Sequence, residues 1–200
     1  MKFNVVFFLS IMITIIFSLI ELTDLNVKTF AIDDSESFSN YTNSKFNFSI
    51  QYPSAWNLTE NKLHPELANT SSTIEITSPF EGSKDLLQEK FLININKLQE
   101  NITFNEYVDN ALNEFKNEYR DFKLISNNST IIDNHNGTKL SYSYLAGIAP
   151  LSIKLIMNHN IISDGNKVYV LTFGTPPDKY YEYLSSVQKM VNSFKILDKK

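Results

Sequence analysis

Runs in which apolar and polar side chains alternate recur along this chain, and they limit its possible folds more than any other feature. A period of two is typical of a β-strand with one buried face. The runs span residues 46–52, 74–76, 91–95, 122–133, 140–144, 151–162 and 168–173. Pro53 and Pro79 follow two of them and end them. The sequence therefore predicts several short strands rather than a helical bundle.

One segment between the strands has a helical period instead. Thr103 and Glu106 are spaced as a capping box, in which each side chain binds the backbone amide of the other residue. Apolar residues then recur three or four positions apart from Phe104 to Tyr119. We expect one amphipathic helix here, with its apolar stripe on the sheet.

Glycine and proline positions predict how the later elements connect. Asn136-Gly137 predicts a hairpin turn with positive φ at both residues, and Asp164-Gly165 predicts a second tight turn. Residues 147–150 predict a break between strands. Thr175 suits the cap of a second helix that contains residues 180–194, with Pro176 at its first position. This order predicts an α+β sandwich, an antiparallel sheet with packed helices, in a single domain.

The N-terminus indicates export. Residues 3–20 are uncharged and strongly apolar, and they follow Lys2, as in a secretory signal. The segment is either cleaved after Ala31 or kept as a membrane anchor. The sequence thus divides into a signal peptide or anchor (1–31), a polar linker (32–40) and a domain (41–200) outside the cytoplasm. The domain is either secreted or anchored at the outer face of the cytoplasmic membrane.

Composition narrows the partners and the modifications. The net charge of −4 and the single arginine, Arg120, argue against a nucleic-acid partner, because such binding needs clustered positive charge. The absence of cysteine excludes disulfides and thiolate metal sites. Eight asparagines are candidates for N-glycosylation because they stand in N-x-[ST] triplets. They are Asn40, Asn47, Asn57, Asn69, Asn101, Asn127, Asn128 and Asn136.

Residues for chemistry are few. No Gly-rich phosphate loop or nucleophile elbow occurs, and we expect no enzyme activity. His64, His135 and His159 are expected to be surface or turn residues. Asp133 with His135 is a weak candidate metal site, because a carboxylate and an imidazole two residues apart can share an ion. Trp56 is expected to be buried, whereas some of the many tyrosines are expected to be exposed at an interface.

Two stretches resemble PsbP-like domains. The first runs from Phe46 through Tyr52-Pro53 to Trp56. The second is the C-terminal part of the chain, with a strand at 168–172, a helix that contains Tyr180 and Tyr181, and Ser193-Phe194 at its end. The resemblance covers roughly residues 41–197. It implies an α/β/α sandwich in an extrinsic or exported protein, and calcium as a possible ligand.

These observations support two functions. The first is an exported, non-catalytic accessory or binding module that associates with an extracytoplasmic protein complex, with a membrane contact through residues 3–20 if these are retained. The alternative is a protein that binds a small ligand or a calcium-type metal ion in a cleft between sheet and helices.

Overall fold

The computed structural model describes residues 36–61, 70–82, 87–148 and 151–198. The predicted signal or anchor and Asn69 lie outside these residues. The elements are β1 (Phe38–Asn43), β2 (Phe48–Pro53), β3 (Asn57–Asn61), β4 (Thr70–Thr77), β5 (Lys90–Lys97), α1 (Phe104–Glu118), β6 (Arg120–Ile132), β7 (His135–Ile148), β8 (Leu151–Asp164), β9 (Lys167–Thr175), α2 (Tyr180–Ser193) and β10 (Lys195–Ile196). Within these described residues, no helix is long and apolar enough to cross a membrane.

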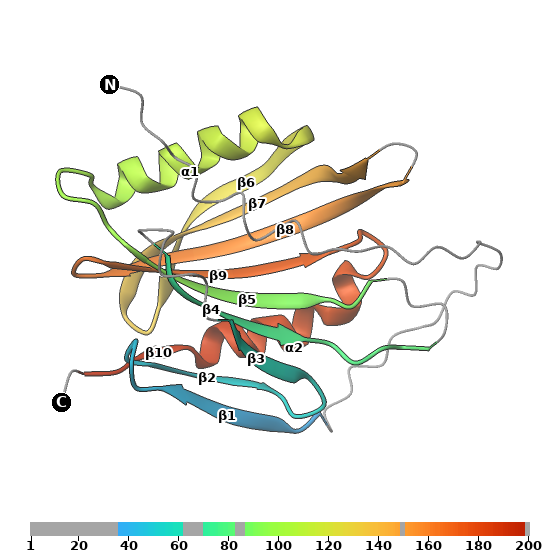
Figure 1. The fold of residues 1–200 in the computed structure, drawn as a ribbon, viewed down its shortest axis with the longest axis horizontal. Helices are drawn as coiled ribbons and strands as arrows, with labels where there is room; N and C mark the ends of the chain where they lie inside the picture. The colour runs from blue at the N-terminus through green and yellow to red at the C-terminus, as the bar shows by residue number, and fades with distance from the viewer. Residues whose placement is uncertain (1–35, 62–69, 83–86, 149–150, 199–200) are drawn as a thin grey trace.

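The predicted α+β sandwich is confirmed. Seven strands form one antiparallel sheet in the order β3-β4-β5-β9-β8-β7-β6, and β1, β2 and β10 form a small second sheet. In Figure 1, α1 covers one face of the large sheet, and α2 with the small sheet covers the other. The chain order of strands, helix, strands and helix therefore produces three layers.

The core on the α2 side joins the beginning and the end of the described chain. β10 pairs with β2, so that Ile196 lies opposite Phe48. The rings of Phe48 and Phe194 stack with centroids 5.4 Å apart, and the Tyr169 ring meets the edge of Phe194 at 5.6 Å. Trp56 is buried as predicted and packs against Tyr183 with centroids 5.7 Å apart. This core holds the layer of α2 and the small sheet against the large sheet.

The core on the α1 side is built around helix α1, which begins at the predicted capping box. The Thr103 hydroxyl accepts a hydrogen bond from the Glu106 amide at 3.2 Å, and the Glu106 carboxylate accepts one from the Thr103 amide at 2.8 Å. The helix that starts there buries Val108, Ala111 and Phe115. These side chains pack on the faces of β7, β8 and β9. The sequence prediction of this helix is confirmed.

The turn between β6 and β7 differs from the predicted one. Asp133 and Asn134 have φ of 48° and 62°, and they form a two-residue turn between the paired Ile132 and His135. The prediction of an Asn136-Gly137 turn is wrong, since both residues lie inside β7. Gly137 is needed there for space, because a Cβ atom would lie 2.4 Å from the Ile161 carbonyl oxygen. The turn between β8 and β9 is shifted in the same way by one residue, to Gly165 and Asn166.

The start of α2 and the predicted linker also need correction. β9 extends through Thr175, which is fully buried, and the helix begins at Tyr180 after Lys179. Thr175 is therefore not its cap. The linker prediction for 32–40 is wrong from Phe38 onward, because β1 starts there and Asn40 pairs with Gln51 of β2. The polar sequence of β1 hides the strand, since few of its side chains alternate in polarity.

Candidate functional site

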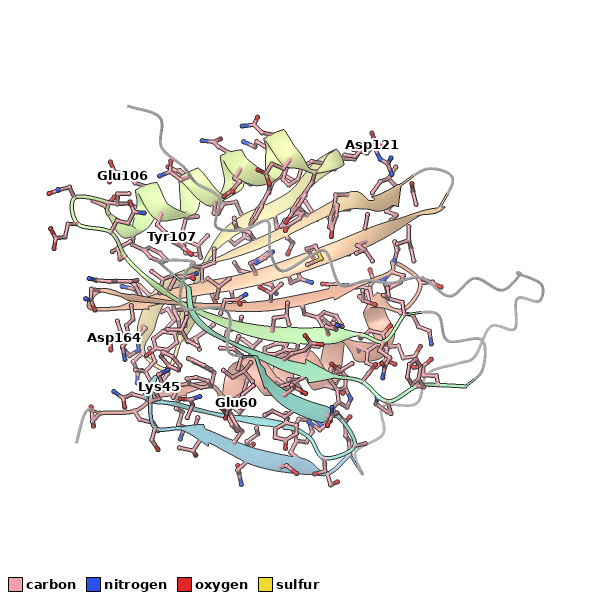
Figure 2. The ribbon with its side chains drawn as sticks, in the orientation of Figure 1. Lys45, Glu60, Glu106, Tyr107, Asp121 and Asp164 are labelled. Carbon is pink, nitrogen blue, oxygen red and sulfur yellow. The ribbon has the colours of Figure 1, made fainter. Side chains whose placement is uncertain are left out.

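The predicted metal ligands lie at one end of the large sheet, beside a hollow. The β8–β9 turn and the residues after β10 meet the start of β7 at this end, and the hollow between them has a volume of about 350 Å³. Its lining includes His135, Asp164, Lys167 and Asp198. Lys167 also reaches the turn between β1 and β2, where its ammonium donates to the Phe46 carbonyl at 3.3 Å. Figure 2 shows Asp164 at this end. We refer to this feature as the turn-end hollow.

The structure brings Asp133 and His135 together, but it uses them to join chain segments. Nδ1 of His135 lies 2.7 Å from the Asp133 carbonyl oxygen, and because a carbonyl can only accept, Nδ1 is the donor. The Asp133 carboxylate accepts a hydrogen bond of 2.7 Å from the Ile196 amide and so fixes β10. Within the described residues, no three acidic or histidine side chains are grouped to hold a metal ion. The two-residue metal site stays a prediction.

His159 is buried between α1 and the sheet, so its prediction as a surface or turn residue is wrong. Its Nε2 lies 2.8 Å from the Tyr142 hydroxyl, and its Nδ1 lies 3.0 Å from the Thr172 hydroxyl. The Phe115 ring stacks on the imidazole at 5.2 Å. Burial lowers the pKa of His159 to about 4 and raises the pKa of Tyr142. The sequence did indicate this burial, because His159 continues the period-two row of apolar residues that contains Leu155 and Met157.

A second buried polar group lies where β4, β5 and β9 come together. The Glu89 side chain accepts a hydrogen bond of 3.0 Å from the Ser78 hydroxyl, and the Glu89 amide donates to that hydroxyl at 2.9 Å. Thr175 contacts the other carboxylate oxygen at 3.5 Å. Burial raises the pKa of Glu89. The sequence did not reveal this residue, because it lies between the strands predicted at 74–76 and 91–95, where no motif was found.

Next to Glu89, two aromatic side chains point into solvent. Phe80 is 67% exposed and Tyr181 is 77% exposed. Glu81, the neighbour of Phe80, accepts hydrogen bonds from Lys179 and Tyr183, which lie on either side of Tyr181 in the chain. Phe80 and Tyr181 are therefore held at the same end of the molecule, at the start of α2. We refer to these two residues, with the half-buried Tyr180, as the aromatic surface.

Most of the predicted glycosylation asparagines are accessible. Asn40, Asn57 and Asn101 are exposed, and so are Asn127, Asn128 and Asn136 on the β6–β7 hairpin. Asn47 is half-buried in a turn with φ of 57°. Accessibility permits modification of the exposed asparagines, and all eight remain candidates.

Solved structures share this fold at low sequence identity. The cyanobacterial PsbP of Synechocystis aligns with a TM-score of 0.56 at 14% identity, over 85% of this chain and 98% of that chain. LpqN of Mycobacterium tuberculosis, described as involved in cell envelope biogenesis, aligns with a TM-score of 0.52 at 15% identity, over 84% and 88%. The Saccharomyces cerevisiae Ran-binding protein Mog1p aligns with a TM-score of 0.51 at 11% identity, over 82% and 97%.

Sequence comparison is more specific than this likeness of fold. No curated protein was found to be similar to the chain. The profile described as PsbP-like protein, however, matches residues 5–196. That match includes the strand that ends in Tyr52-Pro53, the buried Trp56 and the closing Ser193-Phe194. The chain therefore belongs to the PsbP-like protein family.

Proposed function

We propose that this chain is an exported, non-catalytic accessory module that binds a protein complex at the outer face of the cytoplasmic membrane. Membership of the PsbP-like family and the apolar segment at residues 3–20 support this location. Among solved structures of this fold, Mog1p is a protein that binds another protein, Ran. The polar groups with shifted pKa values also fit a binding role, since His159 and Glu89 are closed off by hydrogen bonds within the core.

The observation that carries the proposal is the aromatic surface. Exposed aromatic side chains are costly in water and contribute strongly to protein interfaces, where they bury a large area with few rotatable bonds. The side chain of Phe80 is 67% exposed and that of Tyr181 is 77% exposed.

The aromatic surface is also held in place before any partner arrives. Lys179 forms ion pairs with Glu81 and, at 3.1 Å, with Glu182. Burial opposes charge on Glu81, but hydrogen bonds from Lys179 and Tyr183 outweigh it and lower the pKa of the carboxyl. The loop that carries Phe80 is thus tied to the first turn of α2. A fixed loop loses less conformational entropy when it binds, which favours affinity.

Crosslinking in native membranes tests this proposal. The tagged full-length chain is crosslinked, co-purified and analysed by mass spectrometry. We expect one reproducible protein complex, and crosslinks near residues 80 and 181. Phe80→Ala with Tyr181→Ala should reduce recovery of the complex at least about tenfold, as expected for the loss of two interface anchors.

The control is Asn113→Ala, which removes an exposed side chain from the outer face of α1 instead. It should leave recovery of the complex unchanged. If the wild-type chain brings down no specific protein, the accessory function is wrong. If Asn113→Ala abolishes recovery and the aromatic variant does not, the function holds but the surface is misassigned.

The turn-end hollow supports a second candidate, a binding site for a small polar ligand or a calcium-type ion. Its lining has carboxylates from Asp164 and Asp198 and the imidazole of His135, although the acidic and histidine side chains of the described residues are not grouped closely enough to hold an ion by themselves. A ligand that binds only the folded state raises the melting temperature. We expect Ca²⁺ or Zn²⁺ to raise that of the wild-type chain and not that of His135→Ala with Asp198→Ala. No shift with either ion or with a panel of metabolites would contradict this candidate.

A further inference from the structure

The two outer strands of the large sheet differ in a way that bears on assembly. β3 has five residues and carries Glu60, whose carboxylate accepts a hydrogen bond of 2.6 Å from Tyr41. β6 has 13 residues, and among the described residues no strand pairs with its outer edge. Proteins usually protect such edges with short strands or charges, because unpaired backbone groups template another strand. The short, charged β3 edge has this protection. The β6 edge has charges and bulges only near its start, and residues 126–132 carry neither.

Three large apolar side chains of β6 are exposed, and Leu124 is the least exposed of them at 42%. Ile131 is 71% exposed and Ile125 is 58% exposed. Their exposure shows that helix α1 leaves both uncovered, although Phe122 near the start of the same strand packs in the α1-side core. Between them lie Ser126, Asn127, Asn128, Ser129 and Thr130, all uncharged. A partner strand could therefore approach this edge without burying a charge.

We propose that the free edge of β6 is a homodimer interface, in which β6 pairs with β6 of a second copy of this chain. The strands would run antiparallel about a two-fold axis at Asn128. This occupant is favoured over an unrelated strand because the edge is complementary to itself. In that register, Ile125 lies opposite Ile131 of the second copy, so that each copy supplies both halves of an apolar pair.

The geometry of β6 places these side chains on one face. Ile131 pairs with Asn136 of β7. The next residue, Ile132, points to the other face of the sheet, into the α2-side core. The pairing with β7 shifts between Leu124 and Ser126, which makes Ile125 the extra residue of a bulge. Alternation back from Ser126 puts Ile125 on the face of Ile131. Cross-strand neighbours must share a face to touch, and these two do.

The charges of β6 are compatible with the same register, because no like charges face each other between residues 123 and 133. Asp133 lies in the β6–β7 turn, beyond the end of β6, and takes no part in the strand pairing. A register shifted by two residues loses both apolar pairs.

A single cysteine tests the pairing and its register together, since the chain has no cysteine of its own. In Asn128→Cys, the two thiols would face each other across the axis. Paired residues in antiparallel strands have Cα atoms about 4.5–5.5 Å apart, which is within the range of a disulfide. In the control Thr130→Cys, the two Cα atoms would be separated by four residues along the strands, roughly 13 Å, which is too far.

The experiment uses the full-length chain in mild detergent under gentle oxidation. We expect a covalent dimer from Asn128→Cys and almost none from Thr130→Cys. Sedimentation of the wild-type chain should show a reversible dimer. The double variant Ile125→Lys with Ile131→Lys should raise the dissociation constant of this dimer at least about tenfold. Both isoleucines are exposed, so we expect these variants to fold, and circular dichroism checks this.

Three results would overturn the proposal. One is a wild-type chain that stays monomeric at all concentrations up to roughly 100 μM, because a dissociation constant of that size is at the weak end for a small interface. Another is equal crosslinking of the two cysteine variants. The third is a glycan on Asn127 or Asn128 in the protein from its native membrane, because a glycan there would block the edge. None of these outcomes depends on the partner complex.

Discussion

His159 connects two strands beneath α1 through both of its ring nitrogens. The Tyr142 and Thr172 hydroxyls lie within hydrogen-bond distance of the neutral ring, and the Phe115 ring covers it. A hydroxyl can donate to one nitrogen and accept from the other, so the neutral imidazole is fully satisfied. Protonation would place a charge in an apolar layer, and burial therefore lowers the pKa of His159 to about 4.

We predict that His159 makes the fold sensitive to mild acid. The unfolded chain takes up this proton near the ordinary pKa of 6.5 and the folded chain only near about 4. Between these values the unfolded state binds more protons, so stability is full above pH 6.5 and falls as the pH drops toward 4. The loss over this window should be roughly 3 kcal/mol. Urea unfolding at a series of pH values measures it.

The variant His159→Gln is the control for this prediction. It keeps a donor and an acceptor but does not titrate. The stability advantage of the wild-type chain over the variant should shrink between pH 6.5 and 4. An advantage that stays constant across this range would show that His159 is not the source of the acid sensitivity.

At Gly137 we predict a steric rather than a conformational requirement. In Gly137→Ala, the new Cβ would lie 2.4 Å from the Ile161 carbonyl oxygen and 2.5 Å from Cγ2 of Ile162. Overpacking of this kind costs about 2 kcal/mol. Asn134→Gly at φ 62° is the comparison and should be nearly neutral, because glycine suits that conformation. Chemical denaturation compares the two. A neutral Gly137→Ala would contradict this reading of β7.

These residues also show where sequence reasoning reached its limit. Asn136-Gly137 has the usual composition of a tight turn, yet Asp133-Asn134 forms it. Both dipeptides can adopt positive φ, and only the strand register decides between them. That register is set by Ile132, which must point into the α2-side core, and this long-range requirement is not visible locally.

At the scale of elements, α1 is the part that the sequence specified best. Its cap, its apolar stripe and its wet face are all local signals. We predict that Thr103→Ala lowers the free energy of unfolding by about 1 kcal/mol, because the Glu106 amide loses its acceptor. Thr103→Ser keeps the acceptor and should cost much less. Thermal or urea unfolding followed by circular dichroism distinguishes the two, and equal losses would contradict the capping role.

The elements that the sequence missed depend on distant partners. β1 is polar and exists because β2 pairs with it along its whole length. β10 has two residues and exists only beside β2. The start of α2 was displaced because Thr175 is drawn into the sheet, where β9 pairs with β8 as far as Ile156. In each case a tertiary contact prevailed over local preference.

At the scale of the whole molecule, one sheet carries two separate cores. The α1-side core is made of segments close in sequence, whereas the α2-side core closes only when β2 meets the C-terminal Phe194. This contact explains why the opening strand and the closing Ser-Phe occur together in the family resemblance. The fold was therefore predictable from motif order, although the candidate aromatic surface was predictable only as a surplus of tyrosines.

We predict that Phe194→Ala weakens the whole α2-side core. Phe194 is fully buried and contacts both Phe48 and Tyr169. Loss of a buried phenylalanine costs about 4 kcal/mol. Trp56, the only tryptophan, lies in the same core and reports its unfolding by fluorescence. Tyr181→Ala, at an exposed site, should change stability by less than about 0.5 kcal/mol. Equal losses would contradict this division of core and surface.

The most direct test of the central claim is the size of the particle that contains this chain in freshly solubilised native membranes. Native gel electrophoresis with an antibody measures it. Binding to a complex predicts migration well above a dimer of the 23.0 kDa chain, and a shift to monomer or dimer in the variant with Phe80→Ala and Tyr181→Ala. Migration of the wild-type chain as monomer or dimer alone would contradict the claim.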